Sequence, residues 1–297
     1  MSTLCEAAGM SPQNYYKGCR ARRRREVDEE AVVEMVKRER ALQPRLGARK
    51  LRVLLEEELE EAGIRMGRDR LFEVLRGQDL LIRRRRRGTR TTDSGHGFRT
   101  YPNRYRELEL GGAHEAWVSD LTYVRTDEGF VYVSVIGDAW SRKIVGYAAE
   151  RTLEATGPVR ALRMALAQLP PEARPMHHSD RGIQYCCRAY VEALEARGLP
   201  LSMTEKDHCY ENAQAERLVG ILKQEYGLGE TFRTRAQVPA ALKQAVTLYN
   251  TRRPHTSLGY KTPHQVHEEG SRAAEAAVTP VALRAPSVTA ASTVRMF

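Results

Sequence analysis

Three runs of β-branched and aromatic residues follow one another in the middle of the chain, and they restrict the fold more than any other feature. They cover residues 115–126, 129–140 and 143–152, and they read EAWVSDLTYVRT, GFVYVSVIGDAW and KIVGYAAERT. Only short turns separate them, so each strand is expected to pair with the next in an antiparallel meander. The largest domain is therefore built around a sheet.

After residue 152, segments with helical spacing of apolar residues alternate with short β-type segments. The predicted strands are 175–180 and 200–204, and the predicted helices are 158–169, 185–198, 211–225 and 235–252. Strands first and strand–helix alternation afterwards predict an α/β domain over residues 113–268, with a mixed sheet and helices on its faces.

The N-terminal part of the chain has a purely helical pattern. A helical lead is expected over residues 1–28. Residues 29–82 contain three amphipathic stretches, which predict a small all-α helix-turn-helix domain whose third helix enters the DNA major groove. A dimerisation module would have the same pattern, but the basic run that starts at Arg83 favours nucleic acid.

Two segments lack a sustained period. Residues 83–112 are basic and then rich in turn formers, and they are expected to form a basic linker between the domains. Residues 269–297 are mostly Ala, Val, Thr, Ser and Pro, and we expect a disordered tail there.

The net charge indicates a polyanionic partner. The 297 residues include 48 Lys and Arg against 38 Asp and Glu, a formal charge of +10. Residues 1–110 hold 26 of these cations and 18 of these acids, which places +8 in this third of the chain. The N-terminal third is therefore expected to be the main electrostatic contact with nucleic acid.

Targeting signals are not apparent in the sequence. No apolar run approaches the roughly 20 residues that cross a bilayer, and the N-terminus lacks the regions of a secretory signal. The five cysteines form no CxxC pair, which is typical of reduced thiols. We expect a cytoplasmic, nucleoid-associated protein without membrane contact.

Two aspartates stand where predicted strands end or are interrupted. Asp120 interrupts WVSDLTY, and Asp180 closes PMHHSD. Neighbouring strands can bring such residues together, and buried carboxylates repel one another unless a cation or a proton is present. Glu216, on a helical face with Asn212 and Val219, is the candidate for a third acid, although a lone helical glutamate is usually solvated. Oxygen ligands of this kind suit Mg²⁺ or Mn²⁺.

Asp120, Asp180 and Glu216, with 35 residues between the last two, resemble the D,D(35)E triad of retroviral-integrase-like transposases. Five blocks resemble, in order and spacing, the OrfB-type transposases of the IS-three family of bacterial insertion sequences: WVSDLTYVRT, VIGDAWSRKIVGY, HHSDRGIQY, SMTEKDHCYENAQAERLVGILKQE and YNTRRPHTSLGYKTP. The helical block from LGARKLRVLL to VLRGQDLLI resembles their helix-turn-helix region. The resemblance covers about residues 30–265 and implies an RNase H-like, mixed five-stranded sheet with flanking helices.

The resemblance implies a DNA transposase that cuts and joins strands at the ends of an insertion sequence. Asp120, Asp180 and Glu216 would be its catalytic acids and would hold two Mg²⁺ or Mn²⁺ ions. The implied partners are double-stranded DNA, further copies of the chain on that DNA, and a short upstream helix-turn-helix protein joined by translational frameshifting. A catalytically inactive DNA-binding repressor is the alternative, and the intact triad argues against it.

Other residues compete for these roles. Asp138 also ends a β-run, but the resemblance favours Asp120 as the first acid and leaves Asp138 to hold a turn or a basic group. His177 and His178 suggest zinc together with the cysteine pair at 186–187, yet adjacent ligands point in different directions on a strand or helix. No zinc is expected, and each histidine either orients the strand end or approaches a phosphate. The cysteines are expected to pack in a helix.

Basic residues beside these motifs are candidate DNA contacts, because arginine offers a planar fork of donors to phosphate. The candidates are Arg83, Arg84, Arg85, Arg86, Arg87, Arg217, Lys223, Arg252, Arg253 and His255. For the last three, a structural turn around Pro254 is an equal alternative. Arg217 and Lys223 could instead balance nearby acids.

Overall fold

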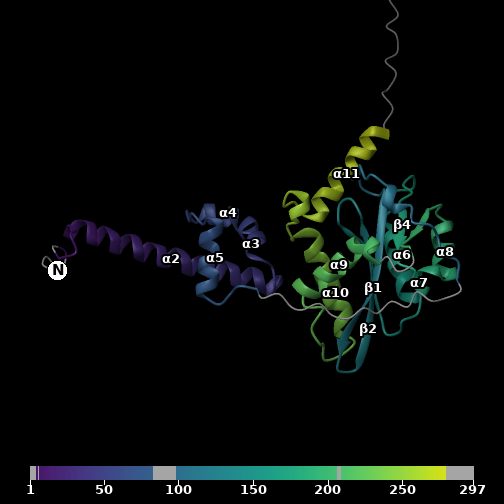
Figure 1. Cartoon of the computed structure of the whole chain (residues 1–297), viewed down its shortest axis with the longest axis horizontal. Coiled ribbons are helices and arrows are strands. Elements are labelled where there is room, and N and C mark those ends of the chain that lie inside the picture. The colour runs from purple at the N-terminus through teal and green to yellow at the C-terminus, as the bar shows by residue number, and fades with distance from the viewer. Residues whose placement is uncertain (1–4, 6, 83–97, 206–208, 279–297) are drawn as a thin grey trace, which may run out of the picture.

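The computed structural model describes residues 5, 7–82, 98–205 and 209–278. A long helix and a small helical domain lie on one side of the molecule, and an α/β core lies on the other (Figure 1). In the described residues, no helix combines the length and the apolar character needed to span a membrane.

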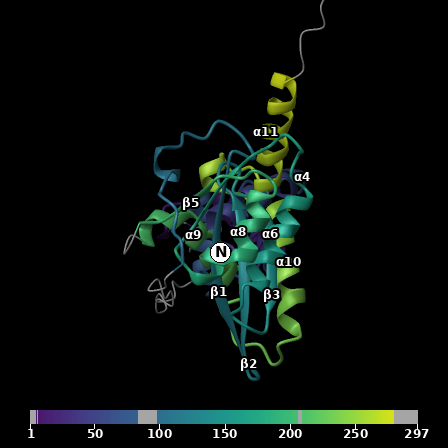
Figure 2. The ribbon, with the colours of Figure 1, turned by 90° about the vertical axis from the view of Figure 1, so that its right-hand side faces the viewer.

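The core is built on a five-stranded mixed sheet of order β3-β2-β1-β4-β5. Its strands are β1 (Ala116–Thr126), β2 (Gly129–Asp138), β3 (Ile144–Glu150), β4 (Met176–Ser179) and β5 (Leu201–Met203). The first three strands pair antiparallel, and β4 and β5 are added parallel to β1. Figure 2 shows the β1–β2 hairpin extending beyond the other strands. The mixed five-stranded sheet expected from the sequence is confirmed.

Helices cover both faces of this sheet (Figure 1). One face packs on α9 (Ala213–Glu225) and α10 (Gln237–Thr251), and it includes Ala116, Val118 and Val124 of β1. The other face includes Trp117 and packs on α6 (Thr156–Ala167), α7 (Ile183–Cys186) and α8 (Arg188–Glu195). Because side chains alternate along a strand, even-numbered β1 residues in this stretch point toward α9 and odd-numbered ones toward α8.

Gly137 of β2 allows α9 to lie close against the sheet. A β-carbon at this position would overlap the side chain of Leu218 on α9. Glycine therefore sets the distance between the sheet and the helix that contains Glu216.

The helical domain comprises part of α2 (Pro12–Leu42), with α3 (Ala48–Leu54), α4 (Glu56–Glu61) and α5 (Arg68–Gly77). Its core gathers Val32, Val36, Leu46, Leu51, Leu71 and Leu75. The small all-α domain is confirmed, but the expected boundary at residue 28 is wrong, because α2 runs through it as one helix. Between Pro12 and Leu42 there is no residue that stops a helix other than the tolerated Gly18.

Two expectations near the ends of the core also need correction. Helix α11 (Pro263–Val278) continues past residue 268, so the segment up to Val278 is not a disordered tail. Its Ala- and Glu-rich sequence has high helix propensity. In the expected linker, residues 83–97, which include the run Arg83–Arg87, lie outside the described residues. Tyr105 in η1 (Tyr105–Glu107) donates its backbone N–H to the Ser202 hydroxyl of the core at 3.1 Å, so this part of the expected linker packs on the core.

Candidate active site

The parallel pairing of β1 and β4 brings Asp120 and Asp180 side by side. The last paired positions are Ser119 and Ser179, and each aspartate is the next residue in its strand direction. Adjacent strands lie about 4.8 Å apart. Two aspartates that are 60 positions apart in sequence therefore lie side by side, where β4 ends beside the middle of β1.

Asp120 points toward the face covered by α9, because it has the same parity as Val118. The N-terminus of α9 is tied to this point by Asn212, whose Nδ2 donates to the carbonyl oxygen of Ser119 at 3.0 Å. Asn212 is only 3 % exposed. Glu216 follows in the first turn of α9 and is exposed. The three predicted acids thus come from two neighbouring strands and the helix above them.

The electrostatics of Asp120 differ from those of an ordinary surface acid. Burial raises the pKa of its carboxyl to about 8, and the charges of Asp180 and Glu216 add to the rise. The backbone N–H of Leu121, at 2.8 Å, and the Lys223 ammonium act in the opposite direction. An acid with this pKa either holds a proton near neutral pH or requires a cation beside it.

The donor set is made of carboxylate oxygens, which suits Mg²⁺ or Mn²⁺. Throughout the described residues, however, no three Asp, Glu, His or Cys side chains converge closely enough to form a ready metal site. Glu216 is exposed, and its side chain can change rotamer. Asp120 and Asp180 therefore fit a divalent ion by the chemistry of their oxygens, whereas the exposed Glu216 is not gathered with them into a three-ligand group.

His177 is a structural residue inside the α8 face of the sheet. Its Nε2 lies 2.7 Å from the Ser119 hydroxyl and 2.7 Å from the Tyr190 hydroxyl. Burial lowers the pKa of His177 to about 3, so the ring stays neutral. Through Ser119, this contact fixes β1 directly before Asp120.

His178 lies on the other face, where its Nδ1 is 3.0 Å from the Ser202 hydroxyl and its ring stacks on Tyr105 at 4.7 Å. Burial lowers its pKa to about 4. Both histidines are buried, so they orient β4 and do not approach a phosphate. Cys186 is buried as well, 3.7 Å from the Met203 sulfur, in agreement with a packing role.

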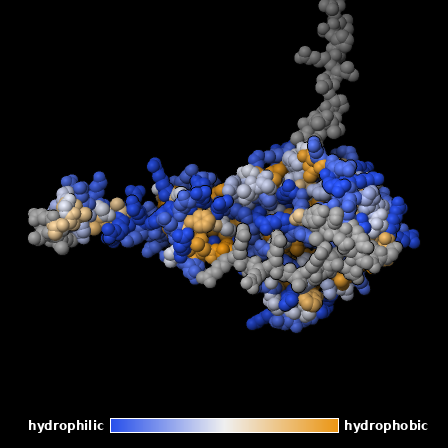
Figure 3. Space-filling view, in the orientation of Figure 1, coloured by the Kyte–Doolittle hydropathy of each residue, from blue (hydrophilic) through white to orange (hydrophobic). Residues whose placement is uncertain are grey.

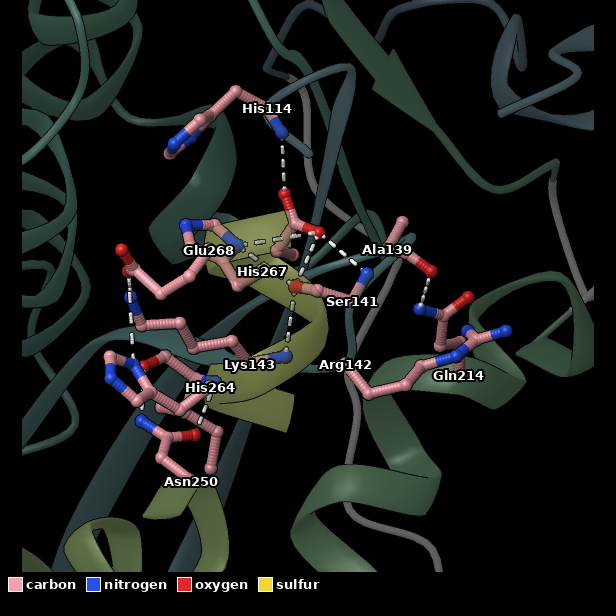
Figure 4. Close-up of polar contacts among 12 residues, drawn as sticks. His114, Ala139, Ser141, Arg142, Lys143, Gln214, Asn250, His264, His267 and Glu268 are labelled. Carbon is pink, nitrogen blue, oxygen red and sulfur yellow. Dashed lines mark hydrogen bonds and ion pairs between the residues drawn. The ribbon is translucent and has the colours of Figure 1, made fainter. Parts of the chain in front are cut away.

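Asp138 holds a turn, as expected, and Figure 4 shows the network around it. One carboxylate oxygen accepts from the backbone N–H and the hydroxyl of Ser141 at 2.8 and 2.7 Å, and the other accepts from the His114 N–H at 2.8 Å. The Ser141 hydroxyl lies 2.9 Å from Nδ1 of His267 in α11. Ser141, Asp138 and His267 are all buried, so this Ser–His–Asp group anchors α11 and is not placed for nucleophilic catalysis.

Two of the expected DNA contacts lie on α9 beside the acids. The Lys223 ammonium is 4.6 Å from the centre of the Tyr123 ring. Burial lowers the pKa of Lys223, while the nearby Asp120 charge raises it. Arg217 is exposed directly after Glu216.

Arg252 and Arg253 have a different place from the expected one. Arg253 is 2 % exposed and donates from Nε and Nη2 to Glu225 of α9 at 2.7 and 2.9 Å. Arg252 makes a two-pronged contact with Glu39 of α2, at 2.9 and 2.6 Å. The expectation of a phosphate contact is therefore wrong for the buried Arg253. Both arginines belong to a junction between the domains.

The junction includes further polar contacts between the helical domain and the core. The Lys50 ammonium lies 2.9 Å from Glu225, and the Tyr226 hydroxyl donates to Gln43 at 2.8 Å. His255 lies near it, and burial together with the Arg253 charge lowers its pKa to about 4. Sequence reasoning missed Glu39 and Glu225, because nothing in the local pattern links residues so far apart. For Asn212, the motif Glu211-Asn212-Ala213 before α9 was the sequence signal that could have indicated its hydrogen bond to Ser119 of β1.

Two family models match the core. Integrase core domain models match residues 112–209 and 197–263. An insertion element IS600 protein of 31 kDa from Shigella sonnei is 35 % identical, over 90 % of this chain and 98 % of that protein. The transposase InsF for insertion sequence IS3A of Escherichia coli K12 is 32 % identical, over 71 % of this chain and 74 % of that protein.

Solved structures of integrase cores are similar at low identity. The catalytic core domain of BIV integrase aligns with 55 % of this chain and 99 % of its own, at 16 % identity and a TM-score of 0.43. The HTLV-2 integrase catalytic core domain in complex with magnesium aligns with 52 % of this chain and 96 % of its own, at 17 % identity and a TM-score of 0.41.

Proposed function

The chain belongs to the IS3 family of insertion-sequence transposases with an integrase core, and we propose that it cuts DNA strands at the ends of its insertion sequence and joins them to target DNA in a divalent-metal-dependent reaction. The observation that carries this proposal is the side-by-side position of Asp120 and Asp180 beneath α9. The raised pKa of Asp120 supports it, since a cation there relieves the repulsion between the acids.

The three acids have separate tasks in this proposal. Asp120 of β1 and Asp180 at the end of β4 would hold a divalent ion, and Glu216 would add a third carboxylate from α9. When bound, two Mg²⁺ or Mn²⁺ ions supply the charge that activates the attacking oxygen and stabilises the leaving oxygen. Asn212 keeps α9 at a fixed distance from the strand, so that Glu216 stays within reach of the aspartates.

The DNA approaches from the exposed side of α9. Arg217 is exposed beside Glu216, and the Lys223 ammonium lies near Asp120. Both are proposed to contact phosphates on either side of the bond that is cut, because cations there offset the charge of the backbone. The partners are double-stranded DNA and further copies of the chain on it. An upstream protein fused by frameshifting stays a prediction from the resemblance.

The test is strand cleavage by the full-length protein on labelled duplex DNA with the two ends of its own insertion sequence. We expect nicks at those ends with Mg²⁺ or Mn²⁺ and none with EDTA. Asp180→Asn should reduce the cleavage rate roughly a thousandfold while DNA binding is retained, because a metal ligand is lost and the fold is not.

Asp127→Asn is the matched control, because Asp127 is an exposed aspartate in the turn of the β1–β2 hairpin. It should cleave at the wild-type rate. Equal cleavage by wild type and Asp180→Asn would refute the catalytic assignment. DNA binding without cleavage under any metal condition would favour the repressor alternative.

A further inference from the structure

The first half of α2 lies apart from the helical domain and the core, and in the described part of the chain it is bordered by N-terminal residues, where Cys5 and Met10 line a hollow with Tyr15 and Cys19. We call residues 12–28 the arm, since they project away from both the helical domain and the core (Figure 1). Ser11 caps its start by accepting from the backbone N–H of Asn14 at 3.2 Å, and Pro12 occupies the first turn. Both are strong helix-start signals. The helix therefore begins at Ser11 by local sequence and not by packing.

The arm concentrates positive charge. Six of the nine residues from 17 to 25 are cations, and all six are exposed: Lys17, Arg20, Arg22, Arg23, Arg24 and Arg25. In Figure 3 hydrophilic residues on this part of the surface are interspersed with less polar ones. Cations three and four positions apart, such as Arg20 and Arg24, repel each other on a helix. The arm is thus destabilised by its own charge until an anion neutralises it.

Most cations of the helical domain itself, in contrast, have hydrogen-bond partners. Seven of them bond to an acid or to a backbone carbonyl: Lys37, Arg38, Arg40, Lys50, Arg52, Arg68 and Arg70. None of the six arm cations has such a partner within the residues that the structure describes. Their charge is available to another molecule.

A second copy of the chain is a poor match for the arm. Helices that pair need an apolar stripe, and the exposed large apolar residues of the arm are only Tyr16 and Val27. The acids that follow the arm are also partly engaged, since Glu29 pairs with Arg70 and Glu34 with Lys37. A second arm would therefore bring more repulsion than attraction.

The phosphate backbone of duplex DNA is a better match. A helix is 10–12 Å wide and the major groove is about 12 Å wide. At 100° per residue, Lys17, Arg20, Arg23 and Arg24 fall within one arc of about 120°, and Arg22 and Arg25 lie on the other side. Cations on both sides of a helix can reach the phosphates of both groove walls at once.

We propose that the arm is a separate DNA-binding element that lies along a groove of duplex DNA and contacts its phosphates without reading the sequence. The arm points away from the core, so it lengthens the DNA footprint on the side remote from the catalytic acids (Figure 1). The proposal rests on DNA as the partner in the proposed function, but it needs neither metal nor catalysis.

The test measures binding of the full-length protein to a fluorescent duplex of unrelated sequence, in EDTA, across a range of salt concentrations. The variant replaces Arg22, Arg23, Arg24 and Arg25 by Gln. Each lost phosphate contact lowers the slope of log K against log salt by about 0.9. We expect the slope to fall by roughly 2 to 4 and the affinity at low salt to fall at least about tenfold. Replacement of the same four residues by Lys should keep most of the slope.

The control replaces four exposed arginines on the α6–α8 side of the core by Gln: Arg151, Arg160, Arg163 and Arg188. It removes the same charge and should leave the slope unchanged, and circular dichroism checks that both variants keep their helix content. If the arm variant and the control bind alike, the proposal is refuted. Light scattering without DNA tests whether the arm binds a second copy. If the arm variant alone loses a dimer while its DNA binding is intact, the arm binds a second copy and the proposal is also refuted. Because the test measures DNA binding and not cleavage, its result can be interpreted even if the catalytic proposal fails.

Discussion

Asp120 lies in β1 and Asp138 lies in β2, and the surroundings of their carboxyl groups are opposite in character. Asp138 accepts three hydrogen bonds from Ser141 and His114 and is fully buried. Asp120 accepts one, from the N–H of Leu121, and lies beside a second aspartate. A buried carboxylate whose oxygens are satisfied by protein donors stabilises the fold. One left beside other acids has a raised pKa and is stabilised by a proton or a nearby cation.

The largest expected difference is in catalysis. Asp120→Asn should lower the rate of DNA cleavage roughly a thousandfold, because it removes an oxygen ligand of the proposed metal site. The same change should raise the stability of the metal-free protein near pH 9 by about 1 kcal/mol or more, because the cost of burying a charged carboxylate and its repulsion from Asp180 and Glu216 both disappear. Cleavage assays and urea unfolding measure the two effects. A loss of both activity and stability would instead show that Asp120, like Asp138, stabilises the fold.

The second difference is in stability. Asp138→Ala should reduce the free energy of unfolding by about 3 kcal/mol, since three donors around it lose their acceptor. Urea unfolding can be followed by the fluorescence of Trp117, which is buried in β1. Asp127→Ala in the exposed hairpin turn should change stability by less than about 0.5 kcal/mol. A loss at Asp138 no greater than at Asp127 would contradict the structural role.

The smallest expected effect concerns pH. Burial, together with the charges of Lys143, His114 and His264, lowers the pKa of His267 in the Asp138 network to about 3. The unfolded chain takes up a proton near pH 6.5 and the folded ring does not, so the contribution of His267 to stability is lost as pH falls from about 6.5 toward 3. Between pH 7 and pH 5 this costs about 2 kcal/mol.

From pH 7 to pH 5, the free energy of unfolding of His267→Gln should therefore fall by about 2 kcal/mol less than that of the wild type. Urea unfolding at both pH values measures this difference. His264→Gln is the control, because His264 is an exposed histidine on the same helix. It should keep the acid sensitivity of the wild type. The same sensitivity in His267→Gln would show that His267 is not held neutral by the network.

Much of the core could be predicted from the sequence, because strand alternation and helical periodicity are local signals. The parallel pairing of β1 and β4, which places Asp120 inside β1 beside Asp180 at the end of β4, joins two segments that both have β-type patterns and an aspartate. The role of Asp138 in a turn was also predictable, since Ser141 donates to it from the turn that follows, whereas its other donor, His114, lies 24 positions earlier in the sequence.

The domain junction could not be predicted in this way. Arg252 and Arg253 stand in a basic, Pro-containing segment that is typical of phosphate contacts, yet their partners Glu39 and Glu225 come from helices far away in sequence. Only the packing of α2 and α9 against the end of α10 brings these charges together. The same lack of a long-range signal explains the wrong boundary in α2, where the arm and the first helix of the domain are one continuous helix.

Helix α9 has Glu216 in its first turn and Glu225 as its last residue. The nine steps from one glutamate to the other span about 2.5 turns and about 13.5 Å. Glu225 bonds to Lys50 of the helical domain, so the position of that domain relative to the third acid follows from the pitch of one helix. A residue inserted into α9 between the two glutamates would rotate its ends by about 100° relative to each other. Under the proposed function, helical phase, and not the length of the chain that joins the domains, would determine where DNA on the helical domain meets the three proposed catalytic acids.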